Sequence, residues 1–422
     1  MDMILWICII CVACIIASVT FCRPYLGIAF IIVSIPFEGV IDFGYISIYP
    51  LEAILAISVL VYIYKSIVAR SNYPVNMKLV YGCIPFLVCI MLSTMKSIAF
   101  SSTAKEVVRW LELFLIYYLT INLINDKKEM RIILYSMFST VAIVSVLEII
   151  NYLSSFETLV YIGERSCLFF DNPNPFAGYV NLVIPVLLGM MMASAFLWER
   201  IVLGTIAALS IIALGLLFSK SGYLSLVLTI VFVFLLIKAK KGIFLGLATL
   251  FVLLTIVLLF AETREDFIGR VGMQQLLASF WFRVMCYSVG FNMLRDVLIL
   301  GIGIGNYHLD IMKFTANSYL VKNHLHSLYL QMLVETGMMG FSAFVFWIVC
   351  IVKYLVSSLK SLEASSHYKL FVGLMGGVIV YLFNNLLDVL VVHGIHLQWG
   401  IILGLAVVLT QFREPETCLK TV

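Results

Sequence analysis

Long apolar runs alternate with short polar connections along the whole chain. A helix needs about 20 residues to cross the hydrocarbon core of a bilayer, and most runs approach that length. Helices satisfy their own backbone hydrogen bonds inside a membrane, so each run predicts a helix rather than a strand. The pattern therefore predicts about 12–13 membrane helices, at 3–21, 26–40, 47–67, 79–95, 104–124, 131–152, 176–196, 201–218, 222–237, 242–261, 337–358, 368–390 and 392–411. The first two are the least regular, because a hairpin near Cys22–Pro24 could turn them into a re-entrant pair.

Two polar stretches on one side interrupt this pattern. Residues 152–175 form the shorter one, and residues 262–336 form the only long polar segment of the chain. Within the longer one, Ser279–Leu300 has helical periodicity with aromatic residues on one side, which is typical of a helix lying along a membrane interface. No internal repeat or separate soluble domain is visible. We therefore expect one all-α polytopic domain over 1–422, with an outer loop at 152–175 and an outer cap at 262–336 that carries short helices.

The composition excludes several classes of protein. Hydrophobic residues make up 63% of the chain and charged residues only 12%, and the mean hydropathy is +1.09. A soluble domain has about 25% charged residues, so this chain could not cover a water-exposed surface. The net charge of +4 is too small for a nucleic-acid-binding protein, and the apolar content is too high for a disordered one.

The basic residues predict the orientation in the membrane, since short cytoplasmic loops carry an excess of lysine and arginine. Alternate loops and the C-terminal end hold Lys65, Arg70, Lys78, Lys127, Lys128, Arg131, Arg200, Lys238, Lys240, Lys241, Lys353, Lys360, Lys369, Arg413 and Lys420. These loops should face the cytoplasm, which places the two long polar segments outside. Basic residues on that outer side run against the preference, so we look for chemistry there.

The first candidate site lies in the segment Gly163–Pro185, which contains Asn-Pro-Asn-Pro. Proline cannot occupy a helix interior without cost, so the next helix should begin near Phe176. Its free amide groups beside Arg165 would suit an anion, ideally a phosphate. The alternative is a capped turn with Arg165 in solvent.

The second candidate is Lys220, in the turn Phe-Ser-Lys-Ser-Gly-Tyr at 218–223. An ionisable side chain at membrane depth is a functional candidate by default. The alternative is that Lys220 reaches out to the interface, as lysine readily does.

The third candidate combines Arg283, the glycine-rich GIGIG at 301–305 and the segment NHLHSLYLQMLVETG at 323–337. No strand precedes the glycines, so they predict a flexible turn with close backbone approach rather than a nucleotide-binding loop. His326 should lie at the outer end of a helix that enters the membrane. A single histidine there could be a satisfied polar residue, but Arg283, Lys220 and Arg165 lie on the same side of the membrane.

No metal or nucleophile site is apparent in the sequence. The outer carboxylates show no clustering or histidine spacing typical of metal ligands, and no G-x-S-x-G is present. Cys167 and Cys286 could form one disulfide at most. Outer cations without a metal, plus one histidine, fit an anionic leaving group attached to a membrane lipid.

The combination of Arg165, FDNPNPFAGYVNLVIP, FSKSGYLSL, WFRVMCYSVGFNMLRDVLILGIGIGNY and HLHSLYLQMLVETGMMG resembles the bacterial O-antigen ligase and polymerase family over roughly 160–345. The resemblance implies a multi-pass protein of the inner membrane with its active site facing the periplasm. It implies a glycosyltransferase without cofactor or metal, whose partners are an undecaprenyl-diphosphate-linked glycan, a glycan or lipid A-core acceptor, and membrane lipids.

The resemblance also implies roles for single residues. Arg283 stands where the family binds the donor diphosphate, with Lys220 and Arg165 as further diphosphate ligands, and His326 opens the motif that supplies the catalytic base. Asn174 and Glu335 would support this site. Lys220 replaces an arginine of many members and loses its bidentate fork, while Ser327 replaces the usual asparagine.

The resemblance implies one of two enzymes, and a third function of another class is also open. The favoured one is a surface polysaccharide polymerase that inverts the anomeric centre, and the second is an O-antigen ligase that transfers finished polymer to lipid A-core. A transporter or flippase for a lipid-linked solute is the alternative from another class, and it predicts broken helices with charges near the bilayer midplane. His324 and His326 would point about 200° apart on one helix, so only one of them could be the base.

Overall fold

The computed structural model describes residues 3–37, 41–42, 47–68, 77–162, 167–170, 172–236, 273–295, 297–315, 324–392 and 394–412. Within these residues the secondary structure is helical, apart from one antiparallel pair of two-residue strands. The elements are α1 (Met3–Cys22), α2 (Tyr25–Ser34), β1 (Ile41–Asp42), β2 (Ser47–Ile48), α3 (Pro50–Ile63), η1 (Tyr64–Val68), α4 (Val80–Ser93), η2 (Thr94–Lys96), α5 (Phe100–Leu123), α6 (Lys127–Ile162), α7 (Pro173–Ala193), α8 (Leu197–Leu216), α9 (Lys220–Leu236), α12 (Met273–Leu294), α13 (Tyr307–Asp310), η3 (Ile311–Lys313), α15 (Leu328–Ser361), α16 (Tyr368–Leu387) and α17 (Ile395–Leu409).

This architecture confirms the prediction of an all-α polytopic membrane protein. Six described helices are long and apolar enough to cross a membrane, and five shorter apolar helices accompany them. The predicted span 242–261 lies outside the described residues. Helix α2 has ten residues, a length of about 15 Å, so alone it covers half of a bilayer core.

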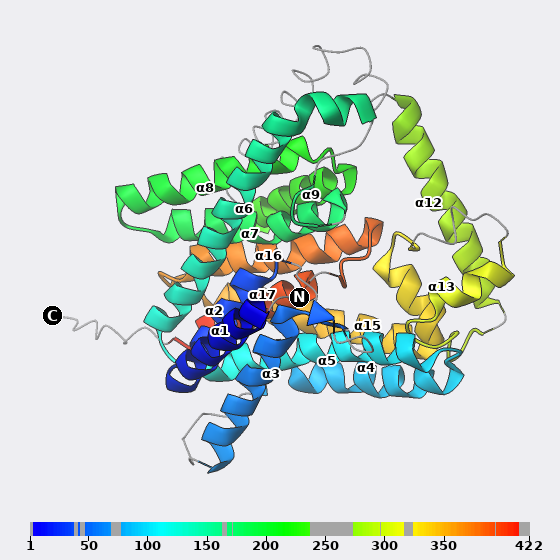
Figure 1. Ribbon diagram of the computed structural model, residues 1–422, viewed down its shortest axis with the longest axis horizontal. Helices are drawn as coiled ribbons and strands as arrows, with labels where there is room; N and C mark the ends of the chain where they lie inside the picture. Colours follow the sequence, from blue (N-terminus) through cyan, green and yellow to red (C-terminus); the bar gives the residue numbers. More distant parts are fainter. Residues whose placement is uncertain are drawn as a thin grey trace.

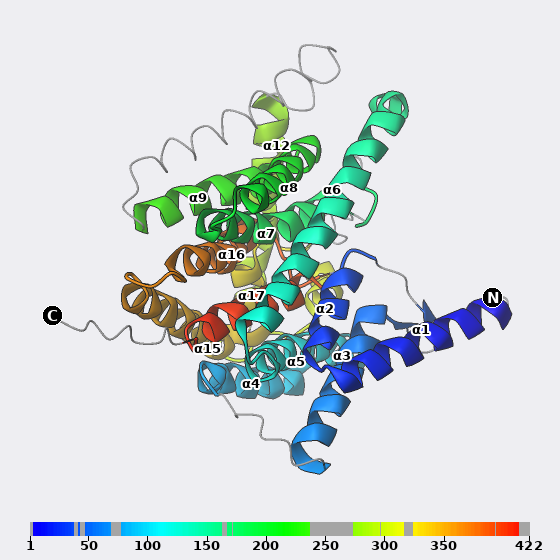
Figure 2. The ribbon, with the colours of Figure 1, turned by 90° about the vertical axis from the view of Figure 1, so that its left-hand side faces the viewer.

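Helices α7 and α16 form the centre of the bundle. Small residues let their backbones approach closely: a Cβ atom on Gly189 would lie only 2.6 Å from the Cα of Gly373. Close approach of this kind is how membrane helices gain packing where no hydrophobic effect separates them from lipid. Aromatic rings of Phe86, Trp110 and Trp347 join α4, α5 and α15 in the same core. Figure 2 shows α1 at the margin of the bundle, beside α3.

The described part of 262–336 carries the 22-residue helix α12 in addition to the short α13 and η3, and it has an apolar core of its own. Cys286, Val289 and Met293 of α12 pack against Tyr307 and Leu325 there. In Figure 1, α12 lies beyond the right-hand ends of α15 and α16 and runs steeply across their direction. This segment therefore covers one end of the bundle.

Several helix ends differ from the predicted ones, and two of them lie in the polar segment 152–175. Helix α6 continues to Ile162, ten residues into the segment expected as a loop. Helix α7 begins at Pro173 rather than near Phe176, because the Asn172 side chain accepts the N–H of Asn174 and Pro173 occupies the first turn, where a missing N–H costs nothing.

Candidate functional site

His326 lies two residues before α15, in a backbone conformation that few non-glycine residues adopt. Its φ is +50°, in the left-handed region. Ser327 follows as the N-cap, and its hydroxyl accepts the N–H of Leu330 at 3.5 Å. His326 therefore lies at the N-terminal end of this helix, where the sequence predicted it. A strained backbone that the surroundings hold in place is a common feature of functional sites.

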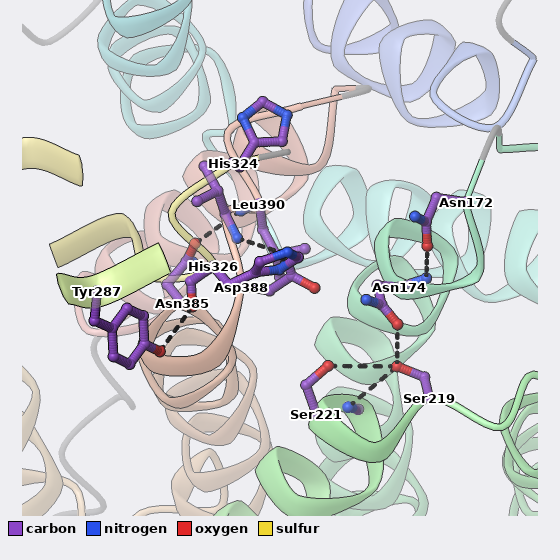
Figure 3. Close-up of polar contacts among 12 residues, drawn as sticks. Asn172, Asn174, Ser219, Ser221, Tyr287, His324, His326, Asn385, Asp388 and Leu390 are labelled. Carbon is purple, nitrogen blue, oxygen red and sulfur yellow. Dashed lines mark hydrogen bonds and ion pairs between the residues drawn. The ribbon is translucent and has the colours of Figure 1, made fainter. Parts of the chain in front are cut away.

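Asp388 is the nearest acidic partner of His326. His326 Nδ1 and Asp388 Oδ1 are 3.7 Å apart, and both side chains are largely buried (Figure 3). Asp388 directly follows α16, its carbonyl accepts the N–H of Leu328, and Oδ1 also accepts the N–H of Val389. Both His326 ring nitrogens lack a hydrogen-bond partner within the described structure. The imidazole is thus held beside a carboxylate and retains capacity for a ligand.

Helix α12 covers the other face of His326. The Phe282 ring contacts the imidazole edge to face, with centroids 5.6 Å apart, and the Tyr287 hydroxyl donates to the His326 carbonyl at 3.2 Å. Arg283 lies between these two contacts along the helix and is half-buried. Burial raises the pKa of Tyr287, and the positive charge of Arg283 partly lowers it again. The guanidinium is therefore close enough to Tyr287 to act on it electrostatically. The structure thus brings Arg283 and His326 to one region.

The starts of α7 and α9 form a second polar group. The Ser219 hydroxyl donates to Asn174 Oδ1 at 3.0 Å and lies 3.5 Å from the Ser221 hydroxyl, as Figure 3 shows. Lys220, the first residue of α9, stands between these two serines. Asn174 therefore fixes the turn that carries Lys220.

Helix α7 connects this group to the histidine side. Leu390, two residues after Asp388, lies so close to α7 that a Cβ atom on Gly178 would come within 2.7 Å of it. Ala177, the neighbouring residue of α7, would lie 2.8 Å from a Cβ atom on Gly222 of α9. The Asp388 loop and the start of α9 therefore pack on neighbouring positions of α7.

The proposed anion site at the start of α7 is not supported by its backbone. Pro173 and Pro175 have no N–H, and the N–H of Asn174 already donates to the Asn172 side chain at 2.9 Å. The first turn therefore offers no unused donor at these three positions, which favours the capped turn. Arg165 lies outside the described residues.

The glycine-rich loop packs against α15 through its backbone. Gly301, Gly303 and Gly305 all have positive φ, and the N–H of Gly303 donates to the Glu335 carbonyl at 3.0 Å. The N–H of Tyr307 donates to the Glu335 carboxylate at 3.4 Å. Close backbone approach, as predicted, is therefore confirmed, and Glu335 is a structural partner of this loop.

His324 and His326 are not on one helix, contrary to the premise of the sequence argument. Both precede α15, and the left-handed turn at His326 separates their surroundings. His324 Nδ1 lies 3.1 Å from His308 Nε2, whereas His326 contacts Phe282 and Asp388. The expected separation of the two imidazoles is therefore present for a different reason.

Part of the sequence also matches a known family. Residues 205–345 match the family described as O-antigen ligase. The match covers about a third of the chain and includes the segments that carry Arg283 and His326. No curated protein shows significant similarity to the chain.

The O-antigen ligase segment contains four of the predicted site residues: Lys220, Arg283, His326 and Glu335. This partial match supports a membrane glycosyltransferase of the O-antigen ligase or polymerase type. Asp388 lies beyond the matched segment, and the sequence reasoning missed it. A lone carboxylate at the edge of a predicted span was the available signal.

The described residues contain no group of three metal-ligating side chains, and Cys167 and Cys286 are both free thiols. The possible disulfide is therefore not formed.

Proposed function

We propose that this protein is a metal-independent, inverting glycosyltransferase that moves a glycan from undecaprenyl diphosphate to a sugar hydroxyl at the periplasmic membrane face. We propose further that it is a surface polysaccharide polymerase. The observation that carries this proposal is the placement of His326 between Asp388 and the helix that bears Arg283. Glycosyl transfer from a diphosphate needs a base that takes the proton of the attacking hydroxyl and a cation that neutralises the leaving group. A histidine and an arginine can supply these two roles.

His326 would act as the base. Asp388 faces Nδ1, so an N–H at Nδ1 leaves the Nε2 lone pair for the acceptor. As the hydroxyl oxygen bonds to the anomeric carbon, its proton passes to Nε2. The bond between that carbon and the diphosphate breaks on the opposite face, which inverts the centre.

Arg283 would bind the departing diphosphate, whose negative charge grows as the bond breaks. A planar guanidinium can hold two phosphate oxygens at once, whereas Lys220 supplies a point charge. Arg165 is a third candidate for this role. Asn174 would act indirectly, since it fixes the turn around Lys220 through Ser219.

The transporter alternative predicts a broken helix with charge in the membrane. Helix α15 is broken at Gly337, and Glu335 beside the break is 1% exposed. However, the N–H groups of the 301–307 loop occupy this break, since Ile302 and Gly303 donate to the carbonyls of Val334 and Glu335. The break therefore serves to bind the 301–307 loop of the cap. This structural role favours an enzyme over a transporter.

Reconstitution in liposomes tests the activity. Purified protein with lipid-linked repeat units as both donor and acceptor on one side should produce longer lipid-linked chains without added metal. Transfer only when lipid A-core is supplied would show a ligase instead. Movement of the lipid across the bilayer with no new glycosidic bond would show a transporter and exclude the proposal.

A deletion strain separates the two enzymes in cells. Loss of a polymerase leaves a single repeat unit on lipid A-core, whereas loss of a ligase leaves full-length chains on undecaprenyl diphosphate. We expect the first result.

A further inference from the structure

Two histidines of the cap form a close pair that the transfer reaction does not use. His308 belongs to α13, and His324 lies in the segment before α15. The distance between His308 Nε2 and His324 Nδ1 is 3.1 Å, and the ring centroids are 4.7 Å apart. Two separate stretches of chain therefore bring imidazole nitrogens together at the outer end of the bundle.

The spacing of these nitrogens fits a metal chelate. A tetrahedral zinc ion has bonds of about 2.0–2.1 Å to imidazole nitrogen, which places two such nitrogens roughly 3.4 Å apart. A small rotation of each ring would aim both lone pairs at one ion. We propose that His308 and His324 bind one divalent transition-metal ion of the Zn²⁺ class, and that this ion inhibits the protein.

The protonation of His324 agrees with a ligand role. Although this side chain has an exposed edge, desolvation by the surrounding protein and the adjacent His308 lower its pKa from 6.5 to about 4. Metals bind the neutral imidazole, so protons compete weakly for His324 at neutral pH.

The number of ligands indicates a regulatory ion rather than a structural one. The described residues contain no cluster of three or more histidine, cysteine or acidic side chains suited to a metal. Water would therefore complete the coordination. Structural zinc sites have four protein ligands, and open sites keep positions for exchangeable ligands.

An ion at this pair would restrict the segment that carries His326. His324 lies two residues before His326, and the ion would tie it to His308 of α13. The left-handed turn at His326 would then be held in one position, and the imidazole could no longer adjust to an acceptor hydroxyl.

Binding is tested without reference to activity. Full-length protein in detergent is titrated with Zn²⁺ by calorimetry and with Co²⁺ by its visible absorption. We expect one site, and affinity at least about tenfold lower in either His308→Gln or His324→Gln, since even indirect ligand partners change affinity by 10–100-fold. His367→Gln, on the loop before α16, is the matched control and should bind as the wild type does. Unchanged affinity in both cap variants would overturn the site.

Inhibition is tested separately, and only this part rests on the proposed function. Zn²⁺ should slow glycan transfer by the wild type and the control, EDTA should restore it, and both cap variants should be insensitive. Binding without inhibition would refute the inhibitory role. Absence of transfer in every protein, with binding intact, would count against the proposed function and leave the ion site standing.

Discussion

His326 Nδ1 and Asp388 Oδ1 lie 3.7 Å apart, so the segment before α15 faces the residue after α16. The two segments are also joined through the backbone, because the N–H of Leu328 donates to the Asp388 carbonyl at 3.2 Å. This backbone contact holds the carboxylate near the imidazole. A carboxylate beside a histidine base stabilises the imidazolium that forms when the base accepts a proton.

Asp388→Asn should therefore slow transfer, by roughly 10²-fold in kcat, with little change in KM, because the variant keeps the shape of the side chain and loses its charge. Rates of transfer measured over a range of acceptor concentrations give both constants. Asp310→Asn, in the cap and paired with Lys313, should change neither of them. A kcat that is unchanged in Asp388→Asn would contradict the positioning role.

The pairing of His326 with Asp388 shows where sequence reasoning stopped. The motif around His326 was visible, because its residue types and order are local. Asp388 becomes its neighbour only when the loop after α16 folds back onto the start of α15, which is a tertiary event. In contrast, the apolar runs predicted α7, α8 and α16 closely, since membrane burial dictates their length.

The glycine loop illustrates the same limit. Gly301, Gly303 and Gly305 predicted close backbone approach correctly, because positive φ suits glycine. Gly301 approaches the backbone of Glu335, whereas Gly303 approaches Ser97 and Gly305 approaches Ser102. No local pattern identifies these partners. Likewise, Asn-Pro at 172–173 contains an N-cap and a first-turn proline, which together could have placed the start of α7 correctly.

Arg283 should be essential if it binds the diphosphate. Arg283→Ala should abolish transfer while the protein remains inserted and folded, and Arg283→Lys should recover part of it, because a point charge replaces a fork. The assay is glycan transfer normalised to protein in the membrane. Arg295→Ala, one residue beyond the end of α12, is the matched control and should retain activity. Wild-type rates in Arg283→Ala would remove this residue from the site.

Gly337→Ala should destabilise the fold. Gly337 has a φ of +66°, and a Cβ atom there would lie 2.2 Å from the Ile299 carbonyl oxygen. Conformational strain of this kind costs on the order of 1–3 kcal/mol of stability. Displacement of the 299–305 loop by the added Cβ would cost more. Thermal unfolding in detergent measures the loss. Gly204→Ala on α8 should be tolerated, because its Cβ would meet only the Met191 sulfur, at 3.4 Å. Equal melting temperatures for the two variants would show that the 299–305 loop does not need this glycine.

The orientation of the chain gives a further prediction. The distribution of lysine and arginine predicts that the cap lies outside and Lys241 inside. Lys241 lies outside the described residues. In a variant without native cysteines, a thiol reagent that reaches the periplasm of whole cells but does not cross the inner membrane is added. It should label Thr315→Cys and leave Lys241→Cys unlabelled. The reverse pattern would invert the whole topology and move the candidate site to the cytoplasm.

The sharpest prediction separates His326 from His324. His326 is beside Asp388 and Phe282, whereas His324 pairs with His308, so the two side chains cannot serve the same hydroxyl. If His326 is the base, His326→Ala should lose roughly 10²–10⁴-fold in transfer rate, and His324→Ala should lose much less.

The chemistry of the replacement decides what His326 does. Glutamine can still donate and accept hydrogen bonds but cannot take up a proton at neutral pH, so His326→Gln should be as inactive as His326→Ala if the residue is a base. If His326 only caps α15 or hydrogen-bonds the donor, His326→Gln should retain most activity. Transfer rates at several pH values, measured in both histidine positions, distinguish these cases. Similar, mild losses at both positions would refute the assignment, and a large loss at His324 alone would make His324 the base.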